Sequence, residues 1–295
     1  MHPFIKQLIA DGPIITDGAW GTELQKRGLQ VGEFPDAWNL FHPERVTEVA
    51  RAYVDAGSQI ILTNTFGANR LRLDDAELAG KVVPINRKGV QISRRAADGR
   101  AYVFAAIGPS GKLLLGGDLS LDELRAAFDE QAEALADAGA DALVVETMAE
   151  LAEAETAVKA ARATGLPVVA CMVFDSGKNK DRTMMGTTPE EAAQALTAAG
   201  ADVIGANCGV GIESIVAVCQ RLRAATDRPI WIKPNAGLPE LSDGQPVYRT
   251  TPAAFASHVP ALLAAGASFV GGCCGTSPAF IEALEQKIEE GCPPV

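Results

Sequence analysis

Several common kinds of functional site are excluded by what this sequence has little of. Only three of its 295 residues are His, so a metal site built from several histidines is excluded. No run of about 18 uncharged apolar residues occurs, which argues against a membrane span. The formal net charge is −11, whereas a nucleic-acid-binding protein would normally carry a basic face. The first 13 residues lack a basic segment followed by an apolar core, so we expect a cytoplasmic protein.

Cysteine, by contrast, is present in a number that needs an explanation. The chain has six: Cys171, Cys208, Cys219, Cys273, Cys274 and Cys292. Disulfides are the poorer interpretation for a chain without a secretion signal. Cys171 and Cys219 lie in apolar segments and are expected to be small buried side chains. Cys292 is expected to be inert at the C-terminus, which leaves Cys208, Cys273 and Cys274 as candidates for chemistry.

Short apolar runs alternate with Ala-rich amphipathic segments along the chain, which predicts buried parallel strands separated by helices. The predicted strands are 13–16, 59–63, 101–107, 141–145, 167–173, 202–206, 229–233 and 268–272. The predicted helices are 43–56, 75–97, 121–138, 150–163, 189–199, 212–225, 252–265 and 278–290. About eight βα units without a linker predict a single (β/α)₈ barrel domain over residues 1–295.

A doubly wound sheet is the competing architecture, and it fits less well. The glycines that follow the first predicted strand, Gly18 and Gly21, do not have the spacing of a dinucleotide-binding loop. The longest irregular stretch is 176–188, which we expect to be a mobile loop over the mouth of the barrel.

Unusual residues gather where the predicted strands end, and in a barrel these carboxyl ends meet at the catalytic face. Cys208 follows the sixth strand, and Cys273 and Cys274 follow the eighth. Those two strands are separated by one other strand, or roughly 10 Å, so inward side chains can converge. Three thiolates favour Zn²⁺ over Mg²⁺ or Ca²⁺ and leave a fourth position open, as in a catalytic zinc site. Glycines on both sides of the Cys pair allow a tight bend.

Polar residues end other strands at the same face. Asp17 follows the first strand and Glu146 the fourth, and two carboxylates there can bind the ammonium group of an amino-acid substrate. A carboxylate at this place is also a common helix cap, so the structural interpretation stays open for both. Asn64 and Asn207 are equally open between strand-end caps and ligand contacts.

These residues resemble the homocysteine S-methyltransferase family, and most closely the homocysteine-binding module of cobalamin-dependent methionine synthase. The resemblance covers nearly the whole chain. It rests on the segments 17–22, 63–69, 145–147, 207–209, 233–237 and 271–276, with sequences DGAWGT, TNTFGAN, VET, NCG, KPNAG and GGCCGT. The last of these, paired with Asn-Cys about 65 positions earlier, is highly specific.

The resemblance implies a catalytic zinc ion held by Cys208, Cys273 and Cys274, with homocysteine as the fourth ligand. It also implies that Asp17 and Glu146 hold the substrate amino group, and that an Asn matching Asn235 can occupy the open zinc position. The implied reaction is methyl transfer to L-homocysteine, giving L-methionine. The large synthases continue into folate- and cobalamin-binding domains and this chain does not, so we expect a free donor or one carried on another polypeptide.

The sequence does not decide the methyl donor, for which betaine, a sulfonium compound and methylcobalamin are all candidates. Betaine would favour an aromatic cage, but aromatic residues are only 5% of the chain, with Trp20, Trp38 and Phe66 near the expected rim. Alternatives are methyl transfer to another small thiol or selenol, and a zinc subunit that docks a separate corrinoid protein. An aldolase or isomerase would need a catalytic Lys or His, for which Lys233 is the candidate.

Overall fold

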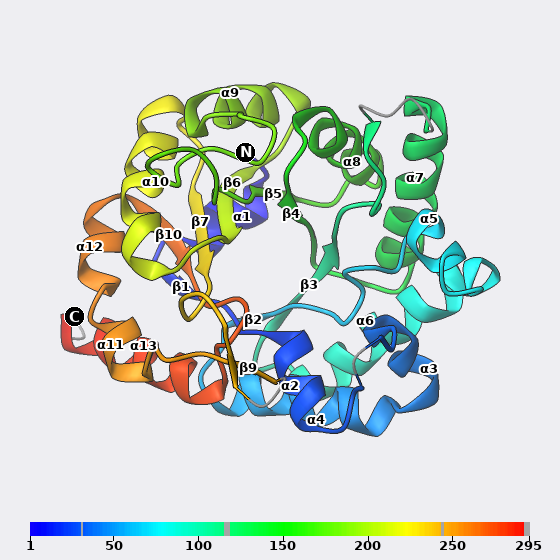
Figure 1. Cartoon of the computed structure of the whole chain (residues 1–295), viewed down its shortest axis with the longest axis horizontal. Coiled ribbons are helices and arrows are strands. Elements are labelled where there is room, and N and C mark those ends of the chain that lie inside the picture. The colour runs from blue at the N-terminus through cyan, green and yellow to red at the C-terminus, as the bar shows by residue number, and fades with distance from the viewer. Residues whose placement is uncertain (31, 115–118, 243–244, 292–295) are drawn as a thin grey trace.

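Eight short parallel strands form a barrel at the centre of the computed structural model, which describes residues 1–30, 32–114, 119–242 and 245–291 (Figure 1). The strands are β1 (Ile14–Ile15), β2 (Ile60–Ile61), β3 (Tyr102–Ile107), β4 (Ala142–Met148), β5 (Val168–Met172), β6 (Val203–Cys208), β7 (Ile230–Pro234) and β10 (Ala267–Val270). Their order in the sheet is β1-β10-β7-β6-β5-β4-β3-β2. A parallel bridge between Thr16 and Ile60 joins the two ends and closes the ring. The predicted (β/α)₈ barrel is confirmed.

A ring of helices surrounds the strands and buries their outward side chains (Figure 1). It consists of α4 (Pro43–Asp55), α6 (Val82–Ala97), α7 (Leu121–Asp137), α8 (Leu151–Ala163), α9 (Pro189–Ala199), α10 (Ile212–Ala225), α11 (Pro252–Ala256), α12 (Val259–Ala264) and α13 (Pro278–Gly291). Shorter elements lie between them: α1 (Pro3–Leu8), α2 (Trp20–Lys26), η1 (Pro35–Ala37), α3 (Trp38–Phe41), α5 (Arg70–Asp74), η2 (Ala79–Lys81) and the hairpin β8 (Glu240–Ser242) and β9 (Gln245–Val247). Within the described ranges, no helix is long and apolar enough to cross a bilayer.

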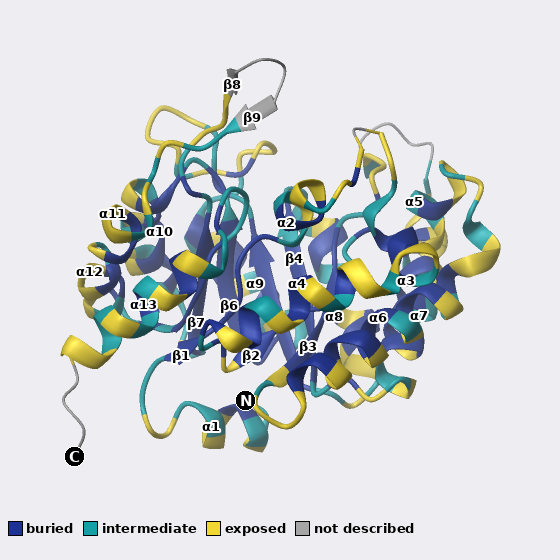
Figure 2. Ribbon diagram, turned by 90° about the horizontal axis from the view of Figure 1, so that it is seen from below, coloured by how far each residue is buried: buried dark blue, intermediate teal, exposed yellow. Residues whose placement is uncertain are grey.

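Large aromatic side chains fill the inside of the barrel. Trp231 lies between Phe104 and Phe269, with ring centroids 6.1 and 5.2 Å away. At the amino ends of the strands, α1 lies across the opening and buries Ile5 against this cluster (Figure 2). Because that end is covered and the interior is packed, the opposite end, where the carboxyl ends of the strands meet the longer loops, is the face available for chemistry.

Two predicted helices differ from the observed ones, and backbone chemistry explains both. The segment 75–97 is helical only from Val82, because Glu77 adopts a left-handed φ of 58°, which an α-helix cannot contain. The segment 252–265 divides into α11 and α12, since Pro260 has no N–H to donate in the interior of one continuous helix. The loop 176–188 is folded back on itself by a bridge between Ser176 and Arg182.

Candidate metal centre

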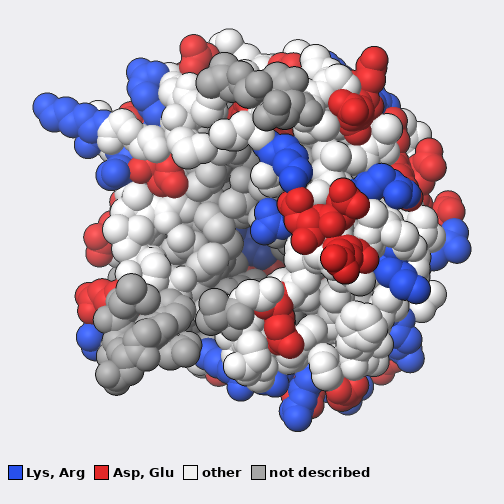
Figure 3. Space-filling model, turned by 45° about the vertical axis from the view of Figure 1, so that its right-hand side comes forward, with Lys and Arg blue, Asp and Glu red and all other residues white. Residues whose placement is uncertain are grey.

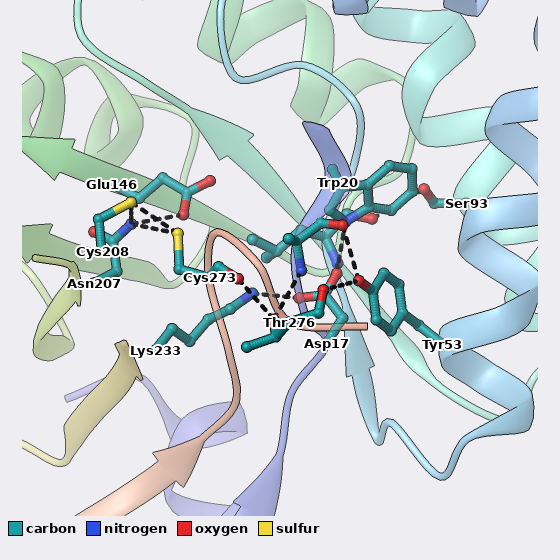
Figure 4. Close-up of polar contacts among 12 residues, drawn as sticks. Asp17, Trp20, Tyr53, Ser93, Glu146, Asn207, Cys208, Lys233, Cys273 and Thr276 are labelled. Atoms are coloured by element: carbon teal, nitrogen blue, oxygen red, sulfur yellow. Dashed lines mark hydrogen bonds and ion pairs between the residues drawn. The ribbon is translucent and has the colours of Figure 1, made fainter. Parts of the chain in front are cut away.

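Three thiols from two separated parts of the chain meet at the mouth of the barrel, and Figure 4 shows two of them, those of Cys208 and Cys273. Cys208 is the last residue of β6, and Cys273 and Cys274 lie in the loop between β10 and α13. The Sγ atoms of Cys208 and Cys273 are 2.8 Å apart, and all three Sγ atoms lie within 4.8 Å of one another. The side chains are partly exposed, so a small molecule can reach them.

The backbone around the Cys pair is held by contacts from neighbouring strands. Cys273 donates its N–H to the carbonyl of Pro234 at 2.8 Å, and the Cys274 carbonyl accepts from Ala236 at 2.9 Å. Gly271 cannot be replaced, because a Cβ there would lie 2.7 Å from the carbonyl oxygen of Asp17. Gly275 has a φ of 82°, and a Cβ on it would collide with the ring of Tyr248. The flanking glycines are therefore required for close approach and for the turn.

The three thiols share negative charge unequally. Hydrogen bonds from Cys208 and Cys273 lower the pKa of Cys274 to about 3. The same cluster raises the pKa of Cys208 well above its ordinary value, chiefly through its hydrogen bond with Cys273. One proton is thus lost readily, while further ionisation is opposed by the first negative charge. A bound cation would remove this opposition.

The donor set fits a soft, tetrahedral metal ion. Two Zn–S bonds of about 2.3 Å at a tetrahedral angle place their sulfurs about 3.8 Å apart. The three Sγ atoms already lie within 4.8 Å of one another, so small side-chain adjustments bring them to this spacing. The Oδ1 atom of Asn235 is buried without a hydrogen-bond partner, while its Nδ2 donates to the Gly209 carbonyl at 2.7 Å. A buried oxygen without a hydrogen-bond partner lowers the stability of the folded protein unless a ligand supplies that partner. The three thiols are donors that zinc accepts, and an amide oxygen is a further donor of a kind that zinc can accept.

Two non-glycine residues with left-handed backbones face one another beside the thiols. Thr147 has a φ of 60° and Cys208 a φ of 58°. Such a conformation is strained for a β-branched residue, at a cost of roughly 1–3 kcal/mol. The side chain of Asn207 holds Thr147 in place, since its Oδ1 accepts from the Thr147 N–H at 2.7 Å. Because Thr147 and Cys208 both keep this strained backbone conformation beside the thiols, we infer that function constrains the conformation of both residues.

Asp17 is fully buried beneath the site, and the structure gives it three partners. Its Oδ1 pairs with the Nζ of Lys233, and its Oδ2 accepts from the Trp20 indole and the Leu62 N–H, both at 2.7 Å. Burial alone would lower the pKa of Lys233, but the carboxylates of Asp17 and Glu146 outweigh it and raise that pKa. Asp17 is thus part of a buried ion pair, and its predicted contact with substrate stays a prediction.

Glu146 lies beside the thiols and is buried, with 8% of the residue exposed. Burial raises its pKa to about 8, although the nearby Lys233 works in the opposite direction. Its Oε2 is 3.3 Å from the Nδ2 of Asn207 and has no cation of its own in contact among the described side chains. A ligand with a positive charge would stabilise the ionised form of this buried carboxyl group.

The other residues considered from the sequence have structural roles. Asn64 donates to the Pro35 carbonyl at 2.7 Å and contacts Asn39, so it joins two loops. Trp38 is 6% exposed and packs in the core with its ring 4.6 Å from that of His42. Trp20 is turned toward Asp17 by its indole hydrogen bond. Cys171 and Cys219 are buried as expected, and Cys292 lies outside the described residues.

Sequence reasoning did not identify the ion pair of Lys233 with Asp17, the Asn207 contacts or the place of Tyr248 over Gly275. For Lys233 a signal existed, because a charged residue closes an otherwise apolar strand that must be buried on both faces. For Asn207 the signal was its place beside Cys208 in the segment 207–209, which left its role open between a strand-end cap and a ligand contact.

Replacing Cys171 tests whether the correct cysteines have been assigned as metal ligands. It lies inside the barrel, 1% exposed and packed among apolar side chains. We expect Cys171→Ala to leave bound zinc at the wild-type level, measured by elemental analysis of the purified protein. A loss of zinc in this variant, with its fold intact, would show that the wrong cysteines have been selected.

Comparisons with known proteins agree with this geometry. Residues 14–288 match the family model described as homocysteine S-methyltransferase. The chain is 32% identical over 294 residues to methionine synthase of Mycobacterium tuberculosis, and 31% identical over 298 residues to that of Mycobacterium leprae. The matches cover 93% and 96% of the chain, but it spans only 24% and 25% of the relatives' length. The metallated form of the homocysteine methyltransferase MmuM from Escherichia coli has a TM-score of 0.81 and 25% identity, covering 97% of this chain and all of that one.

Proposed function

Because this chain belongs to the homocysteine S-methyltransferase family, we propose that it transfers a methyl group from an activated donor to the thiol of L-homocysteine, giving L-methionine. Family membership makes it an S-methyltransferase. The convergence of the Cys208, Cys273 and Cys274 thiols beside a buried carboxyl group that contacts no cation among the described side chains is the observation that carries the proposal. We further propose that the protein binds Zn²⁺, that it uses one of the methyl donors considered above, and that it is cytoplasmic.

In this proposal the three cysteines hold Zn²⁺ and the substrate thiol takes the fourth position. Zinc bound there lowers the pKa of a thiol ligand, so that the sulfur is presented as a nucleophilic thiolate. Asn235 fills that position when substrate is absent, which is consistent with its unpaired Oδ1. Two carboxylates near the thiols match the ammonium group of an amino acid.

The two carboxylates have different tasks within the proposal. Glu146 has no cationic partner in contact within the part of the chain that the structure describes, and in this proposal it makes the direct contact with the substrate ammonium group. Asp17 is surrounded by Lys233, Trp20 and Leu62, so it contributes through its charge and by fixing the Trp20 ring at the mouth. Substrate is thereby held at both ends, with its sulfur facing the opening through which the donor approaches.

A donor carried on another domain or polypeptide is the second candidate, and the surface around the mouth favours it. Loops after β3, β5 and β7 expose Leu113, Met184 and Leu238, each more than half accessible. We propose that these side chains together form a contact surface for a partner, since a contiguous exposed apolar patch marks such a surface. Figure 3 shows a hollow in the surface with acidic and basic side chains along its right-hand edge. A separate corrinoid protein is a partner of this kind.

The proposal is tested by measuring methionine formation from homocysteine with the zinc-loaded protein. Betaine, S-methylmethionine and methylcobalamin are supplied in separate reactions, with and without homocysteine. Turnover with one donor supports the proposal and names the reaction. If homocysteine neither binds the zinc-loaded protein nor is methylated by any donor, the proposed function is wrong. Homocysteine binding without turnover would favour a donor delivered by a partner protein.

We expect Glu146→Gln to weaken homocysteine binding about tenfold or more and to leave zinc content unchanged, because a neutral amide cannot pair with an ammonium group. With a pKa of about 8, the wild-type carboxyl must lose its proton to bind this group, so affinity should rise with pH from 6 to 8. The dependence of log Kd on pH should be shallower in the variant, as measured by calorimetric titration.

Glu153→Gln is the matched control, since Glu153 is also buried with a raised pKa but pairs with Ser110 outside the thiol cluster. It should bind homocysteine as the wild type does. The folded-state pKa of Glu146 exceeds the ordinary value of 4.5, so its protonated form favours folding and that stability is lost as pH rises through about 8. Glu146→Gln should therefore resist alkaline pH better than the wild type. Unchanged homocysteine affinity in this variant would remove Glu146 from the site.

A further inference from the structure

The carboxamide of Asn207 lies between the carboxyl group of Glu146 and the thiol cluster (Figure 4). The residue is 1% exposed and precedes Cys208 at the end of β6. Its Nδ2 is 3.3 Å from Glu146 Oε2 and 3.9 Å from the Sγ atoms of both Cys208 and Cys273. A single side chain thus contacts both the group expected to bind the substrate ammonium and the thiols expected to bind metal.

The shortest contacts of this carboxamide are with Thr147 at the end of β4. Asn207 Oδ1 accepts from the Thr147 N–H at 2.7 Å, and Nδ2 donates to Thr147 Oγ1 at 2.6 Å. This donation uses one of the two hydrogens on Nδ2, so the second is available to Glu146 and the sulfurs. The Thr147 hydroxyl keeps its own hydrogen, and its nearest sulfur, on Cys208, is 4.0 Å away.

The paired contacts with Thr147 matter because this residue is held in a left-handed backbone conformation, with a φ of 60°. Thr147 directly follows Glu146 inside β4, and the pairing of β4 with β5 is irregular between Val145 and Met148, so both residues belong to the same irregularity of the strand. Such irregularities redirect side chains, here that of Glu146. A β-branched residue does not adopt this φ without support from its surroundings. The carboxamide of Asn207, which belongs to the chain segment that also carries Cys208, supplies that support.

We propose that Asn207 is a positioning residue that couples the substrate-ammonium subsite to the metal site, by holding the Thr147 turn and by directing its remaining N–H at Glu146 and the thiolates. The proposal rests on the proposed function, since it assumes that homocysteine binds at these two subsites. When substrate and metal are bound, the remaining hydrogen bond is made to charged acceptors and is strengthened.

The test uses protein loaded with Co²⁺ in place of Zn²⁺, because cobalt–thiolate absorption reports on the thiol cluster independently of turnover. Homocysteine is titrated into the wild type, Asn207→Ala, Asn207→Asp and the control Asn86→Ala. Asn86 is also a fully buried amide, and it donates to two carbonyls, those of Ala68 and Val82, both at 2.8 Å. We expect about a tenfold rise in the homocysteine Kd for both Asn207 variants, the change that a lost hydrogen bond of 1.4 kcal/mol produces, and none for Asn86→Ala.

Asn207→Asp keeps the acceptor for the Thr147 N–H, so it guards against a folding defect, but it replaces the donor with an acceptor and adds a negative charge beside Glu146 and the thiols. Weakened binding in both variants would show that a neutral donor is needed at this place. Adding Thr147→Gly to Asn207→Ala is expected to recover about half of the lost binding free energy, because Gly adopts the left-handed turn without support. If Asn207→Ala and Asn207→Asp lower the melting temperature but bind homocysteine with the wild-type Kd and spectrum, the role is structural and the proposal is overturned. A wild type whose spectrum does not respond to homocysteine would instead refute the proposed function on which it rests.

Discussion

Cys273→Ser is expected to lose its zinc and at least about a hundredfold of its methyl-transfer activity, since removing even the outer partners of metal ligands costs 10–100-fold. The Sγ of Cys273 lies 2.8 Å from that of Cys208, and the backbone N–H of Cys273 donates to the Pro234 carbonyl. A hydroxyl is a far poorer ligand for a soft metal than a thiolate. Zinc content by elemental analysis and turnover with the active donor check both parts.

The control for this substitution is Cys171→Ala, which removes a thiol that the barrel interior encloses. Cys273→Ser should fold as the wild type does, because Ser conserves the shape and the loop is held by backbone hydrogen bonds. A Cys273→Ser protein that retains full zinc and full turnover would refute the assignment of this residue as a ligand.

Lys233→Met is expected to destabilise the protein by about 3–5 kcal/mol, the usual cost of removing one partner from a buried ion pair. The side chains of Lys233 and Asp17 are 2% and 0% exposed, so the Asp17 carboxylate would be left as an uncompensated buried charge. Water cannot solvate it without opening the barrel. Urea unfolding at pH 7, with metal loading kept equal, measures the loss.

A double variant distinguishes the loss of the ion pair from the loss of side-chain packing. Asp17→Asn combined with Lys233→Met removes both charges and should recover most of the stability, although not homocysteine binding. Lys287→Met breaks an ion pair with Glu290 on the exposed surface of α13 and should change nothing measurable. Equal stability of Lys233→Met and the wild type would mean that Asp17 is protonated or hydrated in the folded protein.

The two predictions above concern the thiol cluster and the ion pair of Lys233 with Asp17, and sequence patterns identify these two groups to very different extents. The cysteines are visible because glycines flank them and because strands alternate with helices in a regular order. These are local patterns, and a residue that ends a buried parallel strand must lie at the catalytic face whatever the details of packing. The eight strands, most of the outer helices and the common rim of the three thiols follow from such patterns.

Contacts between side chains on different strands are not local, and only the tertiary structure decided them. Lys233 and Asp17 are 216 positions apart, and Asn207 and Thr147 are 60 apart. Whether such residues touch depends on the register of each strand pair and the tilt of the barrel, which no segment of the sequence encodes by itself. The sequence by itself determined the barrel and which thiols share its rim. The structure decided that Asp17 is paired with Lys233 and that Asn207 links Glu146 to the thiols. It also decided that Glu146 contacts no cation among the residues it describes.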